Sequence, residues 1–478
     1  MTQVHDLSAL ELAAALRARE LSAVEALEHY LARIDRLDRG PGSLGAFVTV
    51  TAERARRQAV TADRVLAGWD GTAPLPPLLG VPLPVKDLVP VAGVRWTRGS
   101  AAYADEVADV TDGVVRRLRA AGTVLLGTTN TSELGLSCYT ENTVAPPART
   151  PWDPDRSAGG SSGGAAAAVA AGLAPAAHGN DGGGSVRIPA SACGLVGLKP
   201  SRGRVGPGPL FGDVSGLVTH GPLTRTVADA AALLDAMAGP WPGDPLPPAP
   251  PPPGGTFLPH TARPPGRLRV AWHTRPVLAD APVHPEVAAA VAAVRDLLAD
   301  LGHRVEEVAP PFGPEVVPAF EVVWAALSTL APVPPDREEL LLPLTRWLRQ
   351  RGRAVPASGY LAALTTMQLV GRAAVVATRA YDAVLCPTLA APPAPVGGLR
   401  DDADPAADFA AQKAFSPYCA AYNVSGQPAV QLPLYRSATG LPVGVQLAGR
   451  PGAEHVLLAL AAQLEQARPW RGFTPPCW

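Results

Sequence analysis

The sequence is poor in cysteine and carries no excess of charge of either sign. Its 478 residues include 41 Lys and Arg and 42 Asp and Glu, so the formal net charge is −1. A protein that binds nucleic acid or an anionic membrane surface generally needs a basic excess, so neither partner is expected. The five cysteines are odd in number, scattered and without a CxxC pair. This pattern argues against a disulfide framework and against a zinc site.

Features of secretion and of membrane insertion are also lacking. The N-terminal segment mixes acidic and basic side chains, unlike a secretory signal peptide. The apolar stretch at 158–177 is rich in glycine and alanine and contains serines, which makes it a poor membrane span. A cytoplasmic location is therefore expected.

Lysine is the scarcest of the charged residue types. Only Lys86, Lys199 and Lys413 occur among the 41 basic residues. A GC-rich genome that favours arginine codons would produce this bias. Lysine, unlike arginine, can release its proton near neutral pH. The three lysines are therefore candidates for a role that arginine cannot fill.

Patterns typical of helices and strands alternate along most of the chain. Two capping boxes, Ser8 with Glu11 and Ser22 with Glu25, each precede an amphipathic helical run. Further helices are predicted at 109–121, 164–172, 285–300, within 310–380 and at 453–467, and strands at 78–89, 123–130, 173–178, 268–274, 381–388, 428–434 and 442–449. Such alternation predicts a three-layer α/β/α fold in which helices flank a large mixed β-sheet.

A proline-rich passage at 239–255 interrupts this alternation. It is compatible with a domain linker or with a long surface loop inside one domain. We favour a single domain over residues 1–478. Within it we expect N-terminal helices at 1–65, a core at about 75–238, a proline-rich surface loop at 239–265 and a variable helical pocket region at about 305–380.

Two glycine-rich clusters, at 159–164 and 180–187, stand out as places where the backbone can approach another group closely. Neither matches a nucleotide-phosphate loop. Residues 160–164 match GxSxG, but a nucleophile elbow needs a strand immediately before it, and the preceding ARTPWDPDRSA is no central strand. A purely structural role for the glycines stays open at this point.

His178 and Asp181 lie close in sequence to Ser185 and suggest a Ser-His-Asp triad. The three-residue spacing beside a glycine turn does not favour the stacking of side chains that such a triad needs. A buried, hydrogen-bonded histidine is the preferred interpretation of His178.

Residues 157–204 resemble the defining stretch of the amidase signature family. Further segments resemble family segments in family order, namely PVKD at 84–87, GTTNTSELGL at 127–136, TPWDP at 150–154, HGPLTRTVADA at 220–230 and the run at 423–452. The resemblance covers nearly the whole chain and is weakest at 240–265 and 305–380. Because many motifs occur together and in order, it displaces the purely structural interpretation.

The resemblance implies a Ser-cisSer-Lys triad made of Ser185, Ser161 and Lys86, with a cis peptide before Ser161. The two serines are 24 residues apart, which is the usual family spacing. A serine hydroxyl is a weak nucleophile until a base takes its proton. Lysine can act as that base only when neutral, and burial can lower its pKa by several units. We therefore expect an amidase that hydrolyses a small-molecule amide through an acyl-serine, without metal or cofactor.

The resemblance also implies roles around the triad. Backbone N–H groups of Gly182, Gly183 and Gly184 are expected to form the oxyanion hole. Asp181 and Arg187 are expected to brace that loop without taking part in the chemistry.

For the substrate pocket, the resemblance points to the loop at 134–139, with Gly135, Leu136, Ser137 and Cys138 as candidate contacts. The rest of the pocket is expected from 305–380 and 415–425.

Two positions depart from the common family pattern. Asn180 stands where many members have threonine, and Thr128 stands where lysine is common. The variant around Asn180 is closest to general amidases and 6-aminohexanoate cyclic dimer hydrolases, and matches the A subunit of glutamyl-tRNA amidotransferase less well. Transfer of the acyl group to an amine, a non-catalytic binding role and a homodimer stay open.

Overall fold

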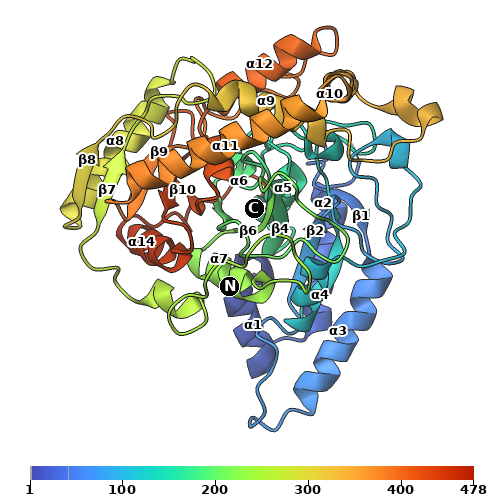
Figure 1. Cartoon of the computed structure of the whole chain (residues 1–478). Helices are drawn as coiled ribbons and strands as arrows, with labels where there is room; N and C mark the ends of the chain where they lie inside the picture. Colours follow the sequence, from blue (N-terminus) through green and yellow to red (C-terminus); the bar gives the residue numbers. More distant parts are fainter. Residues whose placement is uncertain (1–2, 41) are drawn as a thin grey trace.

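The core of the computed structural model, which describes residues 3–40 and 42–478, is an eight-stranded mixed sheet flanked by helices (Figure 1). Its strand order is β4-β6-β5-β10-β11-β9-β7-β8. The pairs that β7 makes with β8 and β9 are parallel, whereas the other neighbours are antiparallel. These strands are β4 (Ala176–Asp181), β5 (Val196–Lys199), β6 (Thr219–Thr224), β7 (Arg269–Trp272), β8 (Arg304–Glu307), β9 (Ala383–Pro387), β10 (Ala429–Arg436) and β11 (Pro442–Gly449). The expected α/β fold with helices around a large mixed sheet is confirmed.

A second, three-stranded sheet was not expected from the sequence. It has the order β1-β3-β2 and consists of β1 (Phe47–Val50), β2 (Pro82–Lys86) and β3 (Val124–Thr129). β2 also lies beside β4 of the large sheet. The last residue of β2 is Lys86, so this contact brings a lysine to the edge of the large sheet.

The helices form largely where local signals predict them. Both capping boxes are present, with Ser8 and Ser22 each accepting from a backbone N–H and each glutamate reaching back. The α-helices are α1 (Ala9–Ala18), α2 (Ala23–Leu37), α3 (Ala52–Ala67), α4 (Gly113–Ala120), α5 (Gly163–Ala170), α6 (Arg187–Cys193), α7 (Val227–Met237), α8 (Pro285–Asp300), α9 (Val316–Leu327), α10 (Pro343–Arg353), α11 (Ala357–Thr378), α12 (Pro405–Phe415), α13 (Cys419–Ser425) and α14 (Glu454–Ala467). Short 3-10 turns are η1 (Val4–Asp6), η2 (Ala101–Tyr103), η3 (Glu133–Gly135), η4 (Leu258–Ala262) and η5 (Pro335–Leu340).

Helix α5 shows why its sequence is so rich in alanine and glycine. Every residue in it is buried, so it has no polar face. A Cβ added at Gly164 would lie 2.4 Å from both Ala46 O and Asn130 N, a distance that no side chain tolerates. Small residues therefore allow α5 to pass through the interior and to start directly after Ser162.

The proline-rich passage packs against the core of the molecule. Ala249 donates to Gly203 O at 3.1 Å and accepts from Arg204 Nη1 at 3.2 Å. Strands that precede the passage, β4 to β6, and strands that follow it, β7 to β11, share one sheet. Residues on both sides of the passage thus contribute strands to the same sheet.

Helix α11 is a long apolar helix that was not singled out from the sequence. By length and composition alone it could cross a membrane, with a mean hydropathy of 1.4, and 33% of its most apolar window is buried. It packs on α9 and α13, and its outer side includes the exposed side chains of Leu361, Leu369 and Val376.

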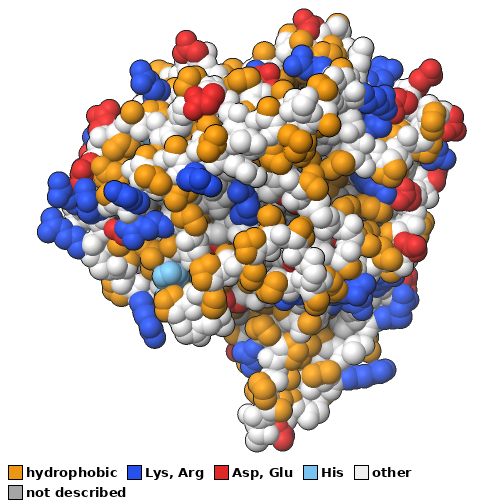
Figure 2. All heavy atoms as spheres, in the orientation of Figure 1, with side chains coloured by type: hydrophobic (Ala, Val, Ile, Leu, Met, Phe, Trp, Pro, Cys, Tyr) orange, Lys and Arg blue, Asp and Glu red, His pale blue; other side chains and the backbone are white. Residues whose placement is uncertain are grey.

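Basic and acidic side chains both occur on the face shown in Figure 2, and basic ones gather at the left of the view, where Figure 1 places β7 and β8. At the sheet edge formed by β7 and β8, Arg269 and Arg304 both pair with Glu306. Two arginines therefore share one glutamate, which leaves this edge with a local positive charge.

Candidate active site

Lys86 is placed at the centre of a buried polar site by the end of β2. Its side chain is fully buried, and Nζ lies 2.7 Å from Ser161 Oγ and 2.6 Å from Asn180 Oδ1. Burial away from water holds the pKa of Lys86 well below its usual value, and the negative charge of Asp181 only partly opposes this effect. A neutral lysine can accept a proton from a neighbouring hydroxyl.

Ser161 lies on the turn that leads into α5, and the peptide bond before it is cis, as the family resemblance implied. A Cβ at Gly160 would lie within 2.8 Å of backbone atoms of Tyr139. The close approach of the two chain segments therefore requires glycine at this position. Ser161 Oγ also lies close to Gly135, because a Cβ added at Gly135 would be 3.6 Å from that oxygen.

Ser185 lies between the second glycine cluster and α6, and it is 7% exposed. Its carbonyl oxygen accepts from the Ser162 N–H at 3.1 Å, which ties the two glycine clusters together. The residue lines a cavity whose wall also contains Gly135, Leu136, Ser137, Cys138 and Gly183. All four residues predicted in the 134–139 loop thus share one cavity with Ser185.

Asp181, at the end of β4, accepts hydrogen bonds from backbone N–H groups of the glycine loop. Its carboxylate accepts from Gly184 N–H at 2.8 Å and from Val186 N–H at 3.2 Å. The N–H of Gly184 therefore points into the protein, and this differs from its expected place in an oxyanion hole. Of the three glycines predicted to form the oxyanion hole, Gly182 and Gly183 do not donate their N–H groups to the Asp181 carboxylate.

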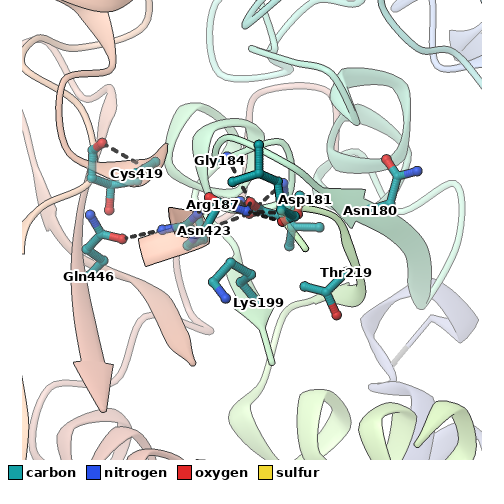
Figure 3. A network of polar contacts seen from close by, with 12 residues as sticks. Asn180, Asp181, Gly184, Arg187, Lys199, Thr219, Cys419, Asn423 and Gln446 are labelled. Atoms are coloured by element: carbon teal, nitrogen blue, oxygen red, sulfur yellow. Dashed lines mark hydrogen bonds and ion pairs between the residues drawn. The ribbon is translucent and has the colours of Figure 1, made fainter. Parts of the chain in front are cut away.

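Arg187 holds Asp181 and connects it to two other elements (Figure 3). Its Nε and Nη2 donate to the two carboxylate oxygens at 3.0 and 2.9 Å. Nη2 also donates to Asn423 of α13 at 2.7 Å, and Nη1 donates to Gln446 of β11 at 2.9 Å. Burial alone would raise the pKa of Asp181, but Arg187 holds that pKa well below its usual range. The contacts are those of the bracing pair expected from the sequence.

Aromatic side chains of α9 cover the glycine loop. Phe320 and Trp324 stack with ring centroids 5.2 Å apart. A Cβ at Gly182 would lie 3.5 Å from the Trp324 ring, and one at Gly183 would lie 3.6 Å from Phe320. Phe320 and Trp324 both line the cavity. Helix α9 therefore supplies apolar surface to the cavity from within 305–380, a segment in which the family resemblance is weak.

Polar groups of α12 line the same cavity, and no motif in the sequence pointed to them. Gln412 Oε1 accepts from Cys138 N–H at 2.8 Å. Lys413 pairs with Glu321 of α9, and its Nζ lies 5.5 Å from the Phe409 ring centroid. The scarcity of lysine is the only sequence signal that marked Lys413.

His178 is a core residue, in agreement with the sequence interpretation. Its Nε2 lies 3.0 Å from Nδ1 of His220, and its Nδ1 accepts from the Lys86 N–H at 3.4 Å. Burial lowers the pKa of His178 well below its usual value, so the ring stays neutral. Among the described residues, no group of three or more His, Cys, Asp or Glu is arranged to hold a metal ion.

Comparison with known proteins finds a family model described as Amidase that matches residues 25–458. A relative from Synechocystis sp. that bears an amidase name is 40% identical over 467 residues, which cover 98% of this chain and 89% of that protein. The 6-aminohexanoate-cyclic-dimer hydrolase of Paenarthrobacter ureafaciens is 34% identical, with 95% of this chain and 93% of that protein covered. A solved structure of 6-aminohexanoate cyclic dimer hydrolase matches with a TM-score of 0.89 at 33% identity and full coverage of both chains.

Proposed function

We propose a serine-nucleophile mechanism for this chain, which belongs to the amidase family and is an enzyme that hydrolyses amide bonds. Ser185 is the nucleophile, Ser161 passes the proton and Lys86 is the base. The observation that carries this proposal is the 2.7 Å contact between a fully buried Lys86 Nζ and Ser161 Oγ, on a loop tied to Ser185.

The first half of the reaction forms an acyl-enzyme. Ser185 Oγ attacks the amide carbon while its proton moves to Ser161 Oγ, and the proton of Ser161 moves to the lone pair of Lys86 Nζ. The carbonyl π electrons move to oxygen, and this oxyanion receives backbone N–H bonds from Gly182 and Gly183. A preorganised donor of this kind typically contributes about 10²–10³ in rate.

Collapse of the tetrahedral intermediate breaks the carbon–nitrogen bond. The leaving nitrogen takes a proton from Ser161, which regains one from the Lys86 ammonium, so the amine departs neutral. Water then attacks the acyl-serine by the same proton route in reverse. The product is a carboxylic acid, and Ser185 is regenerated.

The cavity supports a small-molecule amide with an apolar part as the substrate. Leu136, Phe320, Trp324 and Phe409 are among the apolar residues that line it. Related structures of this fold carry the names aryl acylamidase and peptide amidase, besides the cyclic dimer hydrolase. We therefore propose anilides, lactams and amides with a hydrophobic substituent as the substrate class.

A hydrolysis screen of aliphatic amides, anilides and lactams tests the proposal. Wild-type protein is compared with Ser185→Ala and with Ser358→Ala, an exposed serine of α11 that serves as the matched control. We expect turnover in wild type and Ser358→Ala, and at least a thousandfold loss in Ser185→Ala, on the order of the loss on removing a catalytic serine. Equal turnover in all three proteins would exclude Ser185 as the nucleophile.

Labelling with a fluorophosphonate provides a second readout that needs no substrate. Wild type and Ser358→Ala should gain one adduct on Ser185, and Ser185→Ala should gain none. An added amine such as hydroxylamine should intercept the acyl-enzyme and give a hydroxamate. Substrate turnover that never yields a hydroxamate, together with the absence of an adduct, would contradict an acyl-serine intermediate.

A further inference from the structure

We infer that Asn180 is a positioning residue that orients the lone pair of Lys86 toward Ser161 and stabilises the Lys86 ammonium once it has formed. The inference rests on the proposed function, because it assigns Lys86 the role of the base. The juxtaposition that carries it is the 2.6 Å contact between Lys86 Nζ and Asn180 Oδ1. It joins β2 of the small sheet to β4 of the large one.

Lys86 Nζ has two hydrogen-bond partners in the described part of the chain, Ser161 Oγ and Asn180 Oδ1. A neutral lysine carries two N–H bonds and one lone pair on that nitrogen. An amide oxygen has no proton to offer, so the lone pair cannot form a bond in the direction of Asn180. The contact forms a hydrogen bond only when an N–H of Lys86 points at Asn180 Oδ1. The lone pair of Lys86 then points in another direction and is available to accept the proton of Ser161.

After proton transfer the same contact has a second effect. The Lys86 ammonium has three N–H donors in a fully buried position, where the loss of water makes the charge costly. The amide oxygen of Asn180 already lies within hydrogen-bond distance, so it stabilises the new charge without rearrangement. Asn180 therefore opposes the effect of burial on the pKa of Lys86 and stabilises the state formed during attack.

The identity of residue 180 matters for this argument. A threonine hydroxyl, which the family resemblance implies at this position in many members, can donate as well as accept. It could therefore donate to the lone pair and hold it away from Ser161. In this structure the amide oxygen of Asn180, and not its NH2 group, faces Lys86 Nζ, so the side chain presents an acceptor there.

Other charged or titratable groups surround Lys86, and the test has to separate them from Asn180. Asp181 of β4 tends to raise the pKa of Lys86. His178 of β4 and His220 of β6 are neutral, because burial lowers the pKa of each, that of His220 to about 4. Asp87, the next residue along the chain, accepts from Thr97 N–H at 3.1 Å. Substitutions at position 180 leave all four unchanged.

Two substitutions at position 180 should shift the pH dependence in opposite directions. Asn180→Leu removes the acceptor, so the pKa of Lys86 should fall, and the acid limb of kcat/KM should move down by about one pH unit. Asn180→Asp adds a negative charge, so the limb should move up by about one unit.

We expect kcat to fall by about tenfold to hundredfold in Asn180→Leu, within the range of a general-base contribution. Asn180→Thr should retain more activity than Asn180→Leu, and Gln368→Leu, an exposed amide of α11, should behave as wild type.

The scarcity of lysine allows a direct measurement that does not depend on turnover. A protein labelled with ¹⁵N-lysine has only three side-chain signals, from Lys86, Lys199 and Lys413. The Lys86 titration should move down in Asn180→Leu and up in Asn180→Asp, while the signals of Lys199 and Lys413 also report whether each variant is folded. Unchanged Lys86 titration in both folded variants would overturn the inference. A wild-type protein that shows these shifts but hydrolyses no amide would instead overturn the proposed function.

Discussion

At the scale of single residues, the three lysines occupy three different environments. Lys86 contacts Ser161 and Asn180, Lys413 lines the cavity beside Glu321, and Lys199 lies below the Asp181–Arg187 pair (Figure 3). Burial, reinforced by the positive charge of Arg187, lowers the pKa of Lys199 to about 7. Of the three, Lys86 is the one in hydrogen-bond contact with a candidate catalytic serine.

Replacing Lys86 with arginine should abolish the proposed proton relay even though the positive charge is retained. Arginine stays protonated at any pH at which the protein is folded, so it cannot accept the proton of Ser161. We expect kcat/KM at pH 7.5 to fall by about 10²–10⁴, the usual contribution of a general base, in both Lys86→Arg and Lys86→Ala.

The pH profile has a definite sign. In the proposed mechanism Lys86 accepts a proton only when neutral, so wild-type kcat/KM should be constant above the lowered pKa of Lys86 and should fall as the pH decreases through it. Steady-state kinetics from pH 5 to 10 provide the check. Near-normal activity of Lys86→Arg at neutral pH would show that another group is the base.

At the scale of elements, one buried ion pair connects the glycine loop to the rest of the sheet. Asp181 ends β4, Arg187 begins α6, and the arginine reaches Asn423 of α13 and Gln446 of β11. The pair is fully buried, so each charge depends on the other for its stabilisation.

Arg187→Met should therefore destabilise the protein strongly. The substitution leaves the Asp181 carboxylate buried without its cation, which typically costs about 3–5 kcal/mol in the free energy of unfolding. Arg39→Met removes an exposed pair with Asp35 and should change stability by less than about 0.5 kcal/mol. Urea denaturation at pH 7.5 measures both variants.

The effect of Arg187→Met should also depend on pH. Because the pKa of Asp181 is held below its unfolded value, the pair stabilises the folded state above that value and loses its contribution as the pH falls. The difference between wild type and variant should therefore shrink in acid. Equal stability of Arg187→Met and Arg39→Met at neutral pH would contradict a structural role for the pair.

At the scale of the whole molecule, two carboxylates connect α14, the last helix, to earlier parts of the chain, and their pKa values are shifted in opposite directions. Glu454 pairs with Arg204, and although burial opposes it, this pairing lowers the pKa of Glu454. Glu465 accepts from Val227 N–H at the start of α7 at 3.1 Å, and the nearby Arg471 pairs with Glu11 instead. Burial raises the pKa of Glu465 to about 7.

Glu465→Gln should make the protein more stable at alkaline pH. A carboxyl whose folded pKa is raised favours the fold in its protonated form, and this contribution is lost as the pH rises from about 4.5 to about 7. The glutamine keeps an acceptor for Val227 and carries no charge. We expect its melting temperature to exceed that of wild type by about 1–3 °C at pH 8 and to equal it at pH 4.

Glu454→Gln serves as the comparison, because it removes the partner of Arg204 and should lower the melting temperature at pH 8. Calorimetric scans of the three proteins at both pH values separate the two effects. A lower melting temperature of Glu465→Gln at pH 8 would show that the charged form of Glu465 stabilises the fold.

The sequence by itself determined the features that depend on neighbours along the chain or on a long ordered set of motifs. Capping boxes placed α1 and α2, the alanine-rich run placed α5, and alternating patterns indicated the α/β class. The ordered motifs identified the family and proposed Lys86, Ser161 and Ser185 before any contact between them was known. The cytoplasmic location and the possible homodimer were also predicted from the sequence, and they stay predictions.

Only the tertiary structure decided which groups meet across long separations in the chain. The second sheet, the contact of Lys86 with Asn180 across 94 residues and that of Arg187 with Asn423 across 236 residues have no local signal. The direction of the Gly184 N–H likewise depends on where the Asp181 carboxylate packs. Secondary structure follows from nearby residues, whereas the orientation of a buried polar group is selected by whichever distant partner satisfies its hydrogen bonds when the core closes.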